Sequence, residues 1–236
     1  METLSKDLLS ELECPVCFEY MRPPITLCKN GHNTCCSCKQ KIVSCPTCSG
    51  EFTNIRCFSI EKLARKVKYP CKYRDHRCTE AMVLDEMDLH QEECFYRPFQ
   101  CPLGNISNVK CEEERQLSQL ADHIKKAHPN KFIERTKLLE THLPGYKVNP
   151  TSIWYQVHFM DEEIFFMYCK STEHFIHMCI MHVGVKSKAA NFRYSITIET
   201  VDKDAKITCT HVTQNYKTDL NEIIRNEYCP AFSQTF

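Results

Sequence analysis

The pattern of apolar and polar positions changes character at about residue 130 of the chain. Upstream, apolar residues recur at helical spacing in short segments. Downstream, they gather in runs rich in Ile, Val, Phe, Tyr and Thr, which are typical of β-strands. The predicted strands span 153–160, 163–169, 175–184, 192–200 and 206–212, and a short helix is predicted over 219–226. Because strands follow one another without alternating helices, we expect an antiparallel β-sandwich.

Two short helices are predicted in the part of the chain before residue 130. The N-terminal segment carries leucines at positions 4, 8, 9 and 12, which form one apolar helical face. Residues 59–67 repeat apolar positions at i, i+3, i+4 and i+7, with Ser59 as a candidate N-cap and Pro70 as a stop signal. We interpret this second helix as a semi-rigid spacer.

Composition and charge restrict the class of protein. The 236 residues allow one large domain or two to three small ones, and 30 Lys+Arg balance 30 Asp+Glu, so no overall field favours nucleic acid or an anionic membrane. Residues 1–13 are acidic and lack the apolar core of an export signal, and no run is long enough to cross a bilayer. We therefore expect a reducing location, the cytoplasm with the nucleus as a second site, and the 18 cysteines as metal ligands.

The segment 14–48 concentrates the chemistry of the chain. Its spacing is C-x2-C-x10-C-x3-H-x2-C-x2-C-x6-C-x2-C, which offers four pairs of thiolate or imidazole ligands. Pairs taken alternately form two tetrahedral zinc sites in the interleaved order of a RING finger. One site takes Cys14, Cys17, Cys35 and Cys38; the other takes Cys28, His32, Cys45 and Cys48.

Residues 71–128 contain two further candidate zinc sites. Each pairs a loop carrying two cysteines with a helix carrying the last two ligands. The third site takes Cys71, Cys78, His90 and Cys94; the fourth takes Cys101, Cys111, His123 and His128. Eight Lys/Arg against eleven Asp/Glu in this region, together with irregular spacing, argue against nucleic-acid binding, which is the least favoured interpretation.

Zinc is the expected source of stability for residues 14–128. Modules of about 35 residues bury too little apolar surface to fold alone. Four zinc ions would supply the difference, at roughly 10–16 kcal/mol each by comparison with model fingers. A chelator is accordingly expected to unfold 14–128 and to leave the C-terminal sandwich folded.

Several motifs resemble the seven-in-absentia (Siah) family of ubiquitin ligases. In the RING these are C-P-V-C-F-E-Y, P-P-I, G-H and C-P-T-C, and in the fingers K-Y-P-C-K-Y, R-P-F-Q-C-P and H-P-N-K. The L-P-G at 143–145, the strand 154–159 and N-F-x-Y at 191–194 resemble the TRAF-like substrate-binding domain of that family.

The resemblance implies a multi-domain α+β chain. Its parts are a leader (1–13), a cross-brace RING finger (14–49), a helical linker (50–70), a SINA-type double zinc finger (71–128) and an antiparallel TRAF-like β-sandwich (129–236). The sequence ends before the last strands that the family usually supplies, so the resemblance implies a C-terminally shortened, divergent member.

The resemblance also implies an activity, with no catalytic residue on this chain. The RING would bind a ubiquitin-charged E2 enzyme through Val16 in the first zinc loop, Ile42 on the intervening helix and Pro46 in the second loop. The C-terminal domain would bind substrate proteins, whose ubiquitinated lysines lead to proteasomal degradation, and would form a homodimer.

Ser49 is a departure from the family pattern. Family members usually carry Arg after the last zinc ligand, where it can hydrogen-bond both E2 and ubiquitin. The alternative is therefore a catalytically weak or inactive zinc-binding adaptor of the same fold, which competes for substrates or dimer partners. Cys229 is a further candidate nucleophile, but it lacks an adjacent His/Asp pattern, and a RING ligase needs no thioester of its own. The other strand cysteines are interpreted as buried, inert thiols.

Overall fold

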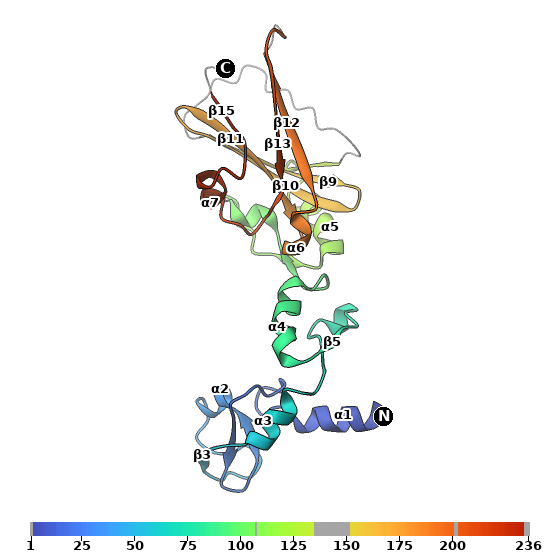
Figure 1. Cartoon of the computed structure of the whole chain (residues 1–236), viewed down its shortest axis with the longest axis vertical. Coiled ribbons are helices and arrows are strands. Elements are labelled where there is room, and N and C mark those ends of the chain that lie inside the picture. The colour runs from blue at the N-terminus through green and yellow to red at the C-terminus, as the bar shows by residue number, and fades with distance from the viewer. Residues whose placement is uncertain (1, 107, 135–151, 201–202, 234–236) are drawn as a thin grey trace. The chain divides into compact units, whose positions relative to one another are not determined.

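The structure is a computed structural model that describes residues 2–106, 108–134, 152–200 and 203–233. The chain divides into two compact units, residues 1–92 and 93–236, each described separately below (Figure 1). Within the described part of the chain, no helix has both the length and the apolar character needed to cross a membrane.

The first unit begins with α1 (Glu2–Glu11) and a small zinc-ligand-bearing fold. Its three-stranded antiparallel sheet has the order β2-β1-β3, formed by β1 (Ile25–Cys28), β2 (Asn33–Cys35) and β3 (Phe52–Arg56). The turn between β1 and β2 contains Gly31 with φ +87°, a conformation that glycine adopts without a Cβ clash. The short helix α2 (Cys36–Lys39) follows β2 directly.

The rest of the first unit packs onto the same core. It comprises α3 (Phe58–Ala64), β4 (Tyr69–Pro70), the 3-10 turn η1 (Arg74–His76), β5 (Ala81–Met82) and α4 (Leu84–Glu93), which reaches the boundary. The helix expected over 59–67 starts one residue earlier, with Cys57 at the N-cap, and continues past Ala64 only as a turn. The core it joins is small, and its buried members are Leu12, Cys14, Met21, Ile25, Cys35, Cys38, Ala64, Tyr69, Leu84 and Met87.

Glu61 connects α3 to the zinc-ligand-bearing sheet. This carboxylate is almost fully buried; it accepts the backbone N–H of Ile25 at 3.0 Å and two hydrogen bonds from Arg56 at 2.9 and 2.6 Å. The hydrogen bonds from Arg56 keep the pKa of Glu61 below its ordinary value despite burial, so the group stays ionised. A charged side chain thus fixes the spacer helix where few apolar contacts are available.

The second unit opens with a finger and continues into a large sheet. The finger contains β6 (Phe99–Gln100), the 3-10 turn η2 (Pro102–Asn105), β7 (Glu114–Arg115) and α5 (Leu117–Ala127), followed by β8 (Phe132–Glu134). The sheet has the order β14-β11-β10-β9-β8, with β15 also on β11. Its strands are β9 (Ile153–Met160), β10 (Glu163–Ser171), β11 (Phe175–Val183), β14 (Gln214–Asn215) and β15 (Ala231–Ser233).

The remaining elements of the second unit are short. The helix α6 (Lys186–Ala189) follows β11, and α7 (Leu220–Arg225) is capped by the Asp219 side chain. β12 (Arg193–Glu199) and β13 (Lys206–Val212) form a separate two-stranded antiparallel hairpin among the described strands. The expected strands and C-terminal helix lie where the sequence pattern placed them, within two residues at each end. The L-P-G motif at 143–145 lies outside the described residues.

The pairing of the short strands differs from the all-antiparallel expectation. β8 joins β9 in parallel and β14 joins β11 in parallel, so the six-stranded sheet is mixed. These strands have three and two residues, too few to carry a periodic pattern. Parallel neighbours also need long connections, whose course local sequence does not reveal.

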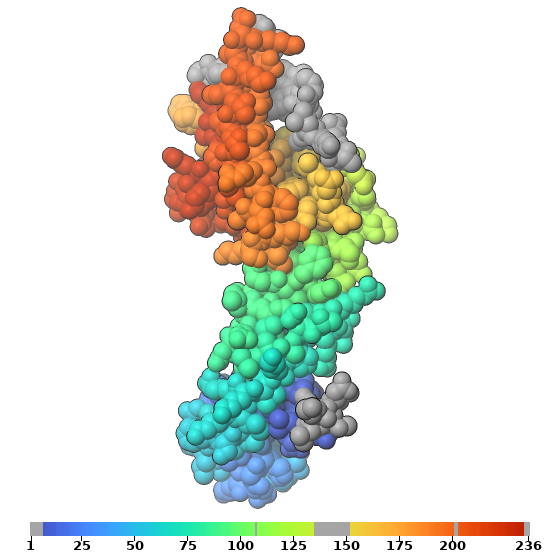
Figure 2. Space-filling model, turned by 45° about the vertical axis from the view of Figure 1, so that its right-hand side comes forward, coloured from blue at the N-terminus to red at the C-terminus, as the bar shows by residue number. Residues whose placement is uncertain are grey.

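One apolar core runs through the finger and the sheet of the second unit. Leu120 and Ile124 of α5 and Val157 and Phe166 of the sheet are all completely buried in it. Asn105 of the finger also donates its side-chain N–H to the carbonyl of Tyr216 at 2.9 Å. In Figure 2 the yellow-green atoms at the end of the finger meet the yellow atoms of β9 without a break. The finger is therefore part of the folding unit that contains the sheet.

Candidate metal centres

Four groups of metal-binding side chains come together in the structure. Within each group the ligand atoms all lie within 4.8 Å of one another. The groups are Cys14, Cys17, Cys35 and Cys38; Cys28, His32, Cys45 and Cys48; Cys71, Cys78, His90 and Cys94; and Cys101, Cys111, His123 and His128. The sixteen ligands predicted from the spacing are thus assembled in the same four sets. The first two sites also show the predicted interleaved order of ligand pairs.

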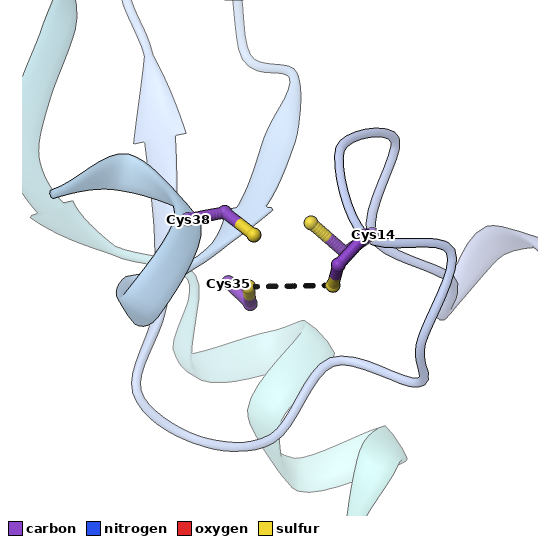
Figure 3. Close-up of side chains that lie close together, drawn as sticks. Cys14, Cys35 and Cys38 are labelled. Carbon is purple, nitrogen blue, oxygen red and sulfur yellow. Dashed lines mark hydrogen bonds between the residues drawn. The ribbon is translucent and has the colours of Figure 1, made fainter. Parts of the chain in front are cut away.

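The first site joins a loop to the start of α2. The backbone N–H of Phe18 donates to the carbonyl of Cys14 at 2.9 Å, a tight turn that brings Cys14 and Cys17 together. Cys35 ends β2, and Cys38 lies one helical turn further on in α2. Figure 3 shows the sulfur atoms of Cys14, Cys35 and Cys38 directed toward a common point. The backbone therefore presents four thiols to one centre.

The second site has separations that suit a tetrahedral zinc ion. The Sγ of Cys28 lies 3.8 Å from the Sγ of Cys48 and 3.5 Å from Nδ1 of His32, and the Sγ of Cys45 lies 3.8 Å from the same nitrogen. Zn–S bonds of about 2.3 Å and Zn–N bonds of about 2.0 Å imply roughly 3.8 Å between sulfurs and roughly 3.5 Å from sulfur to nitrogen. Asn30 donates its side-chain N–H toward Cys48 at 3.3 Å and can support that thiolate from outside the ligand set.

The third and fourth sites repeat one design. His90 projects from α4 and Cys94 follows its last residue, while His123 projects from α5 and His128 is its C-cap. Nε2 of His90 lies 3.5 Å from the Sγ of Cys78, and Nε2 of His123 lies 3.4 Å from the Sγ of Cys111. Both distances match the sulfur-to-nitrogen separation expected around zinc.

The fourth site holds an orphaned buried atom. Nε2 of His128 is buried and has no hydrogen-bond partner among the described residues. Burial, and then the neighbouring His123, lower the pKa of His128, so its imidazole is neutral and has a lone pair to donate. The ring that carries this unpartnered buried nitrogen also brings a ligand atom within 4.8 Å of two thiols and a second imidazole, which fits a metal ligand.

The thiol pKa values show why a cation is needed. Burial raises the pKa of Cys14, but hydrogen bonds from the backbone of Cys35, Cys17 and Val16 outweigh it and lower the pKa to about 7. In the same site the interaction with Cys35, followed by burial, raises the pKa of Cys38 to about 12. Neighbouring thiols cannot all ionise alone, because each thiolate disfavours the next. A bound divalent cation would reverse this and release the protons.

All four donor sets are complete at four protein ligands. The first site has four cysteines, the second and third have three cysteines and one histidine, and the fourth has two of each. These are the donor sets of structural zinc sites, and they offer no open position for a substrate or a catalytic water. Such centres can hold loops and helices in place, but they cannot perform hydrolysis. Chemistry must depend on the surface that the metals shape.

The surface around the first two sites contains the residues expected to contact an E2 enzyme. Val16 is half-buried and packs against the core, Pro46 is exposed, and Ile42 is half-buried. The sequence places Ile42 on the helix, but α2 ends at Lys39 and Ile42 lies in the turn after it. The helix ends early because the chain must turn back toward the ligand Cys45 of the second site.

Two exposed apolar residues beside these loops were not singled out by the sequence pattern. Phe18, next to the ligand Cys17, is 76 % exposed, and Val43, next to Ile42, is 98 % exposed. Single apolar residues in zinc loops carry no periodic signal, so only accessibility reveals them. Ser49 is also exposed, with φ +58°, and its backbone N–H donates to the carbonyl of Cys45 at 2.8 Å.

Comparison with known proteins adds to this geometry. Residues 14–48 match the family described as "E3 ubiquitin-protein ligase sina/sinah, RING finger", and residues 62–139 match "Sina, zinc finger". Two segments of the chain are thus similar to modules of the Sina family. They cover the four sets of zinc-type ligands, so the family matches and the geometry concern the same residues.

Individual relatives agree with the family matches. The chain is 42 % identical over 125 residues to the "E3 ubiquitin-protein ligase sina" of Drosophila melanogaster, covering 53 % of this chain and 39 % of that protein. It is 41 % identical over 123 residues to the human "E3 ubiquitin-protein ligase SIAH2", covering 52 % and 37 %. The match thus spans about two fifths of the length of these relatives.

Proposed function

We propose that this protein is a RING-type E3 ubiquitin ligase that transfers ubiquitin from an E2 enzyme to lysines of substrate proteins. The observation that carries the proposal is the interleaved pair of metal sites in residues 14–48, which matches the Sina RING finger and holds exposed residues of both zinc loops on a rigid base. Relatives named as E3 ubiquitin-protein ligases match about half of this chain.

The proposed contribution of the RING is to bind and orient the E2. Val16, Ile42 and Pro46 would form the contact surface, extended by the exposed Phe18 and Val43. A surface held by metal loses little conformational entropy when a partner binds. Holding the charged E2 beside a substrate would then raise the rate by proximity and orientation.

No residue of this chain is proposed to carry ubiquitin covalently. Cys229, the one thiol considered for that role, is 5 % exposed, and burial raises its pKa to about 11. A protonated, buried thiol is a poor nucleophile. The thioester in the proposed reaction belongs to the E2.

Further parts of the proposal concern the second unit and the cell. We propose that its sheet serves as a TRAF-like substrate-binding and homodimerisation domain, and that substrates are directed to proteasomal degradation. We also propose four structural zinc ions, no nucleic-acid or membrane partner, and action in the cytoplasm with the nucleus as a second location. The four complete ligand sets support the zinc count.

Autoubiquitination of the full chain with purified E1, several E2 enzymes and ubiquitin tests the activity. Cys14→Ser removes a zinc ligand, and Val16→Ala removes a proposed E2 contact without touching the metal. Ile55→Ala is the matched control, because Ile55 is 62 % exposed on β3, outside the zinc loops. We expect ubiquitin ladders that vanish with Cys14→Ser, fall at least tenfold with Val16→Ala, and persist with Ile55→Ala.

Ser49 supports a second candidate function, the weak or inactive adaptor. An uncharged, short side chain stands where an Arg would hydrogen-bond both E2 and ubiquitin. For a weakened ligase, Ser49→Arg should raise the rate of ubiquitin transfer several-fold, while zinc content stays the same. No ladders with any E2, for the wild type and for Ser49→Arg, would favour the adaptor.

A further inference from the structure

Positive charge is unevenly distributed in the first unit. Residues 1–92 carry thirteen Lys/Arg and thirteen Asp/Glu, but seven of the thirteen basic residues lie within 62–77, where Asp75 is the one acidic residue. All seven are exposed: Lys62, Arg65, Lys66, Lys68, Lys72, Arg74 and Arg77. We call these seven side chains the basic strip. The rest of the unit is correspondingly acidic.

Local structure explains why the strip faces solvent. Lys62, Arg65 and Lys66 lie three and four residues apart along α3 and the turn that continues it, so they project from the same side. The opposite side is held in the core by Ala64, which is fully buried and whose carbonyl accepts the Tyr69 hydroxyl at 2.9 Å. In Figure 2 the cyan and turquoise atoms of this part of the chain form a continuous area of surface.

Most of the strip has no anionic partner in the described part of the chain. Arg65 pairs with Asp85 at 3.3 Å, and Arg74 lies 3.9 Å from Asp75. Among the described residues, no carboxylate lies within ion-pair distance of the other five, Lys62, Lys66, Lys68, Lys72 and Arg77. Like charges so close together repel one another, and a bound anion would relieve that repulsion.

We infer that the basic strip is a docking surface for an acidic segment of a partner protein. Lys62 and Lys66 lie one helical turn apart, so their stems stand about 5–6 Å apart. Side chains on one face of an extended peptide repeat at about 7 Å, so successive carboxylates can reach successive cations. The pair between Arg65 and Asp85 is an example of such a contact within the chain.

The surroundings favour a short acidic peptide over a nucleic acid. Asp85 of α4 lies beside the strip, in an ion pair with Arg65, and α4 carries two further exposed carboxylates, Glu86 and Asp88. A phosphate backbone that continued beyond the strip would meet these carboxylates and be repelled. An acidic segment of a few residues can stay within the strip. The inference does not depend on ligase activity, because it concerns binding alone.

Fluorescence anisotropy with the zinc-loaded full chain tests the inference. The probe is a labelled octaglutamate peptide, compared with octaglutamine and with single-stranded octauridylate, at 50 and 200 mM NaCl. The variant Lys62→Gln/Lys66→Gln/Lys68→Gln removes three charges of the strip. The control Lys186→Gln/Lys203→Gln/Lys217→Gln removes three exposed lysine charges from the second unit.

We expect the full chain to bind octaglutamate, and the affinity to fall as the salt concentration rises. The strip variant should lose at least tenfold in affinity for octaglutamate, and the control variant less than twofold. Octaglutamine should not bind. Absence of octaglutamate binding at 50 mM NaCl, or equal loss in both variants, would overturn the inference. Tighter binding of octauridylate would assign the strip to nucleic acid instead. Zinc content and thermal unfolding verify that each variant is folded, and the single variants Lys62→Gln and Lys68→Gln replace the triple if it is not.

Discussion

The two zinc fingers have the same ligand design but belong to different cores. In the first finger, α4 buries Leu84 and Met87 against the RING part of the first unit, in a core held partly by zinc ligands. In the second finger, α5 buries Leu120 and Ile124 completely against a six-stranded sheet. A finger is too small to fold alone, so its neighbour decides which part of the chain depends on its metal. The tandem pair is thus divided between two folding units.

The largest expected effect comes from removing one ligand of each finger. Cys111→Ser should unfold much of the sheet, because Cys111 and Cys101 are members of the core that the sheet shares. Cys78→Ser should leave the sheet folded, since the helix of its finger packs through Leu84 and Met87 into the core of the first unit. Trp154, the one tryptophan of the chain, lies in β9 and reports on the second unit by its fluorescence.

We expect Cys111→Ser to lower the thermal unfolding midpoint reported by Trp154 fluorescence by more than about 10 °C. A loss of about 1 kcal/mol in the free energy of unfolding lowers the midpoint of a domain of this size by about 2–8 °C, and the zinc ion of a finger contributes several times that free energy. An excess of chelator should act like Cys111→Ser. This differs from the expectation, based on sequence alone, that the C-terminal domain survives a chelator. An unchanged Trp154 transition in chelator would show that the sheet does not need the finger.

A smaller effect is expected from Glu61, which holds the first unit where apolar contacts are few. Glu61→Gln loses the charge-assisted hydrogen bonds from Arg56, at a cost of about 2 kcal/mol in the free energy of unfolding. Hydrogen exchange of the α3 amides should accelerate roughly thirtyfold, since about 1.4 kcal/mol is a factor of ten. Glu80→Gln, at an exposed position, serves as the control and should leave exchange unchanged. Equal exchange in the two variants would contradict the structural role of Glu61.

The smallest expected effect is a pH dependence confined to the second unit. His182 is fully buried, donates its Nε2–H to the carboxylate of Glu163 at 2.7 Å, and stacks on Phe192. Burial lowers its pKa, although Glu163 acts in the opposite direction. Because the folded pKa lies below the unfolded value of about 6.5, the unfolded state binds more protons as pH falls.

The stability of the second unit should therefore decrease by up to about 0.8 kcal/mol between pH 7.5 and 6 on account of His182. His182→Gln should flatten this part of the profile, measured by urea unfolding with Trp154 fluorescence. His174→Gln, at an exposed position, is the control and should keep the wild-type slope. A slope that survives His182→Gln would assign the pH dependence to other groups.

The local spacing of cysteines and histidines was enough to predict the four sets of metal ligands. It did not predict which side chains beside those ligands are exposed to solvent. Ligands such as Cys14 and Cys17, or His123 and His128, lie a few residues apart, so turn and helix geometry bring them together. The exposure of Phe18 and Val43 depends on how the loops pack around the metals. The same limit applies to Ile42, whose place after α2 results from the turn toward the second site.

The sequence by itself determined the four ligand sets, the long strands and the composition of the basic strip, because each rests on residues near one another in the chain. Only the tertiary structure decided that the second finger shares its core with the sheet, that β8 and β14 pair in parallel, and that Glu61 reaches Ile25 and Arg56. These contacts join residues far apart in the sequence or depend on burial. The shared apolar core is stabilised by removing surface from water, and the hydrogen bonds by partners that only the folded chain brings together, so no local pattern records either.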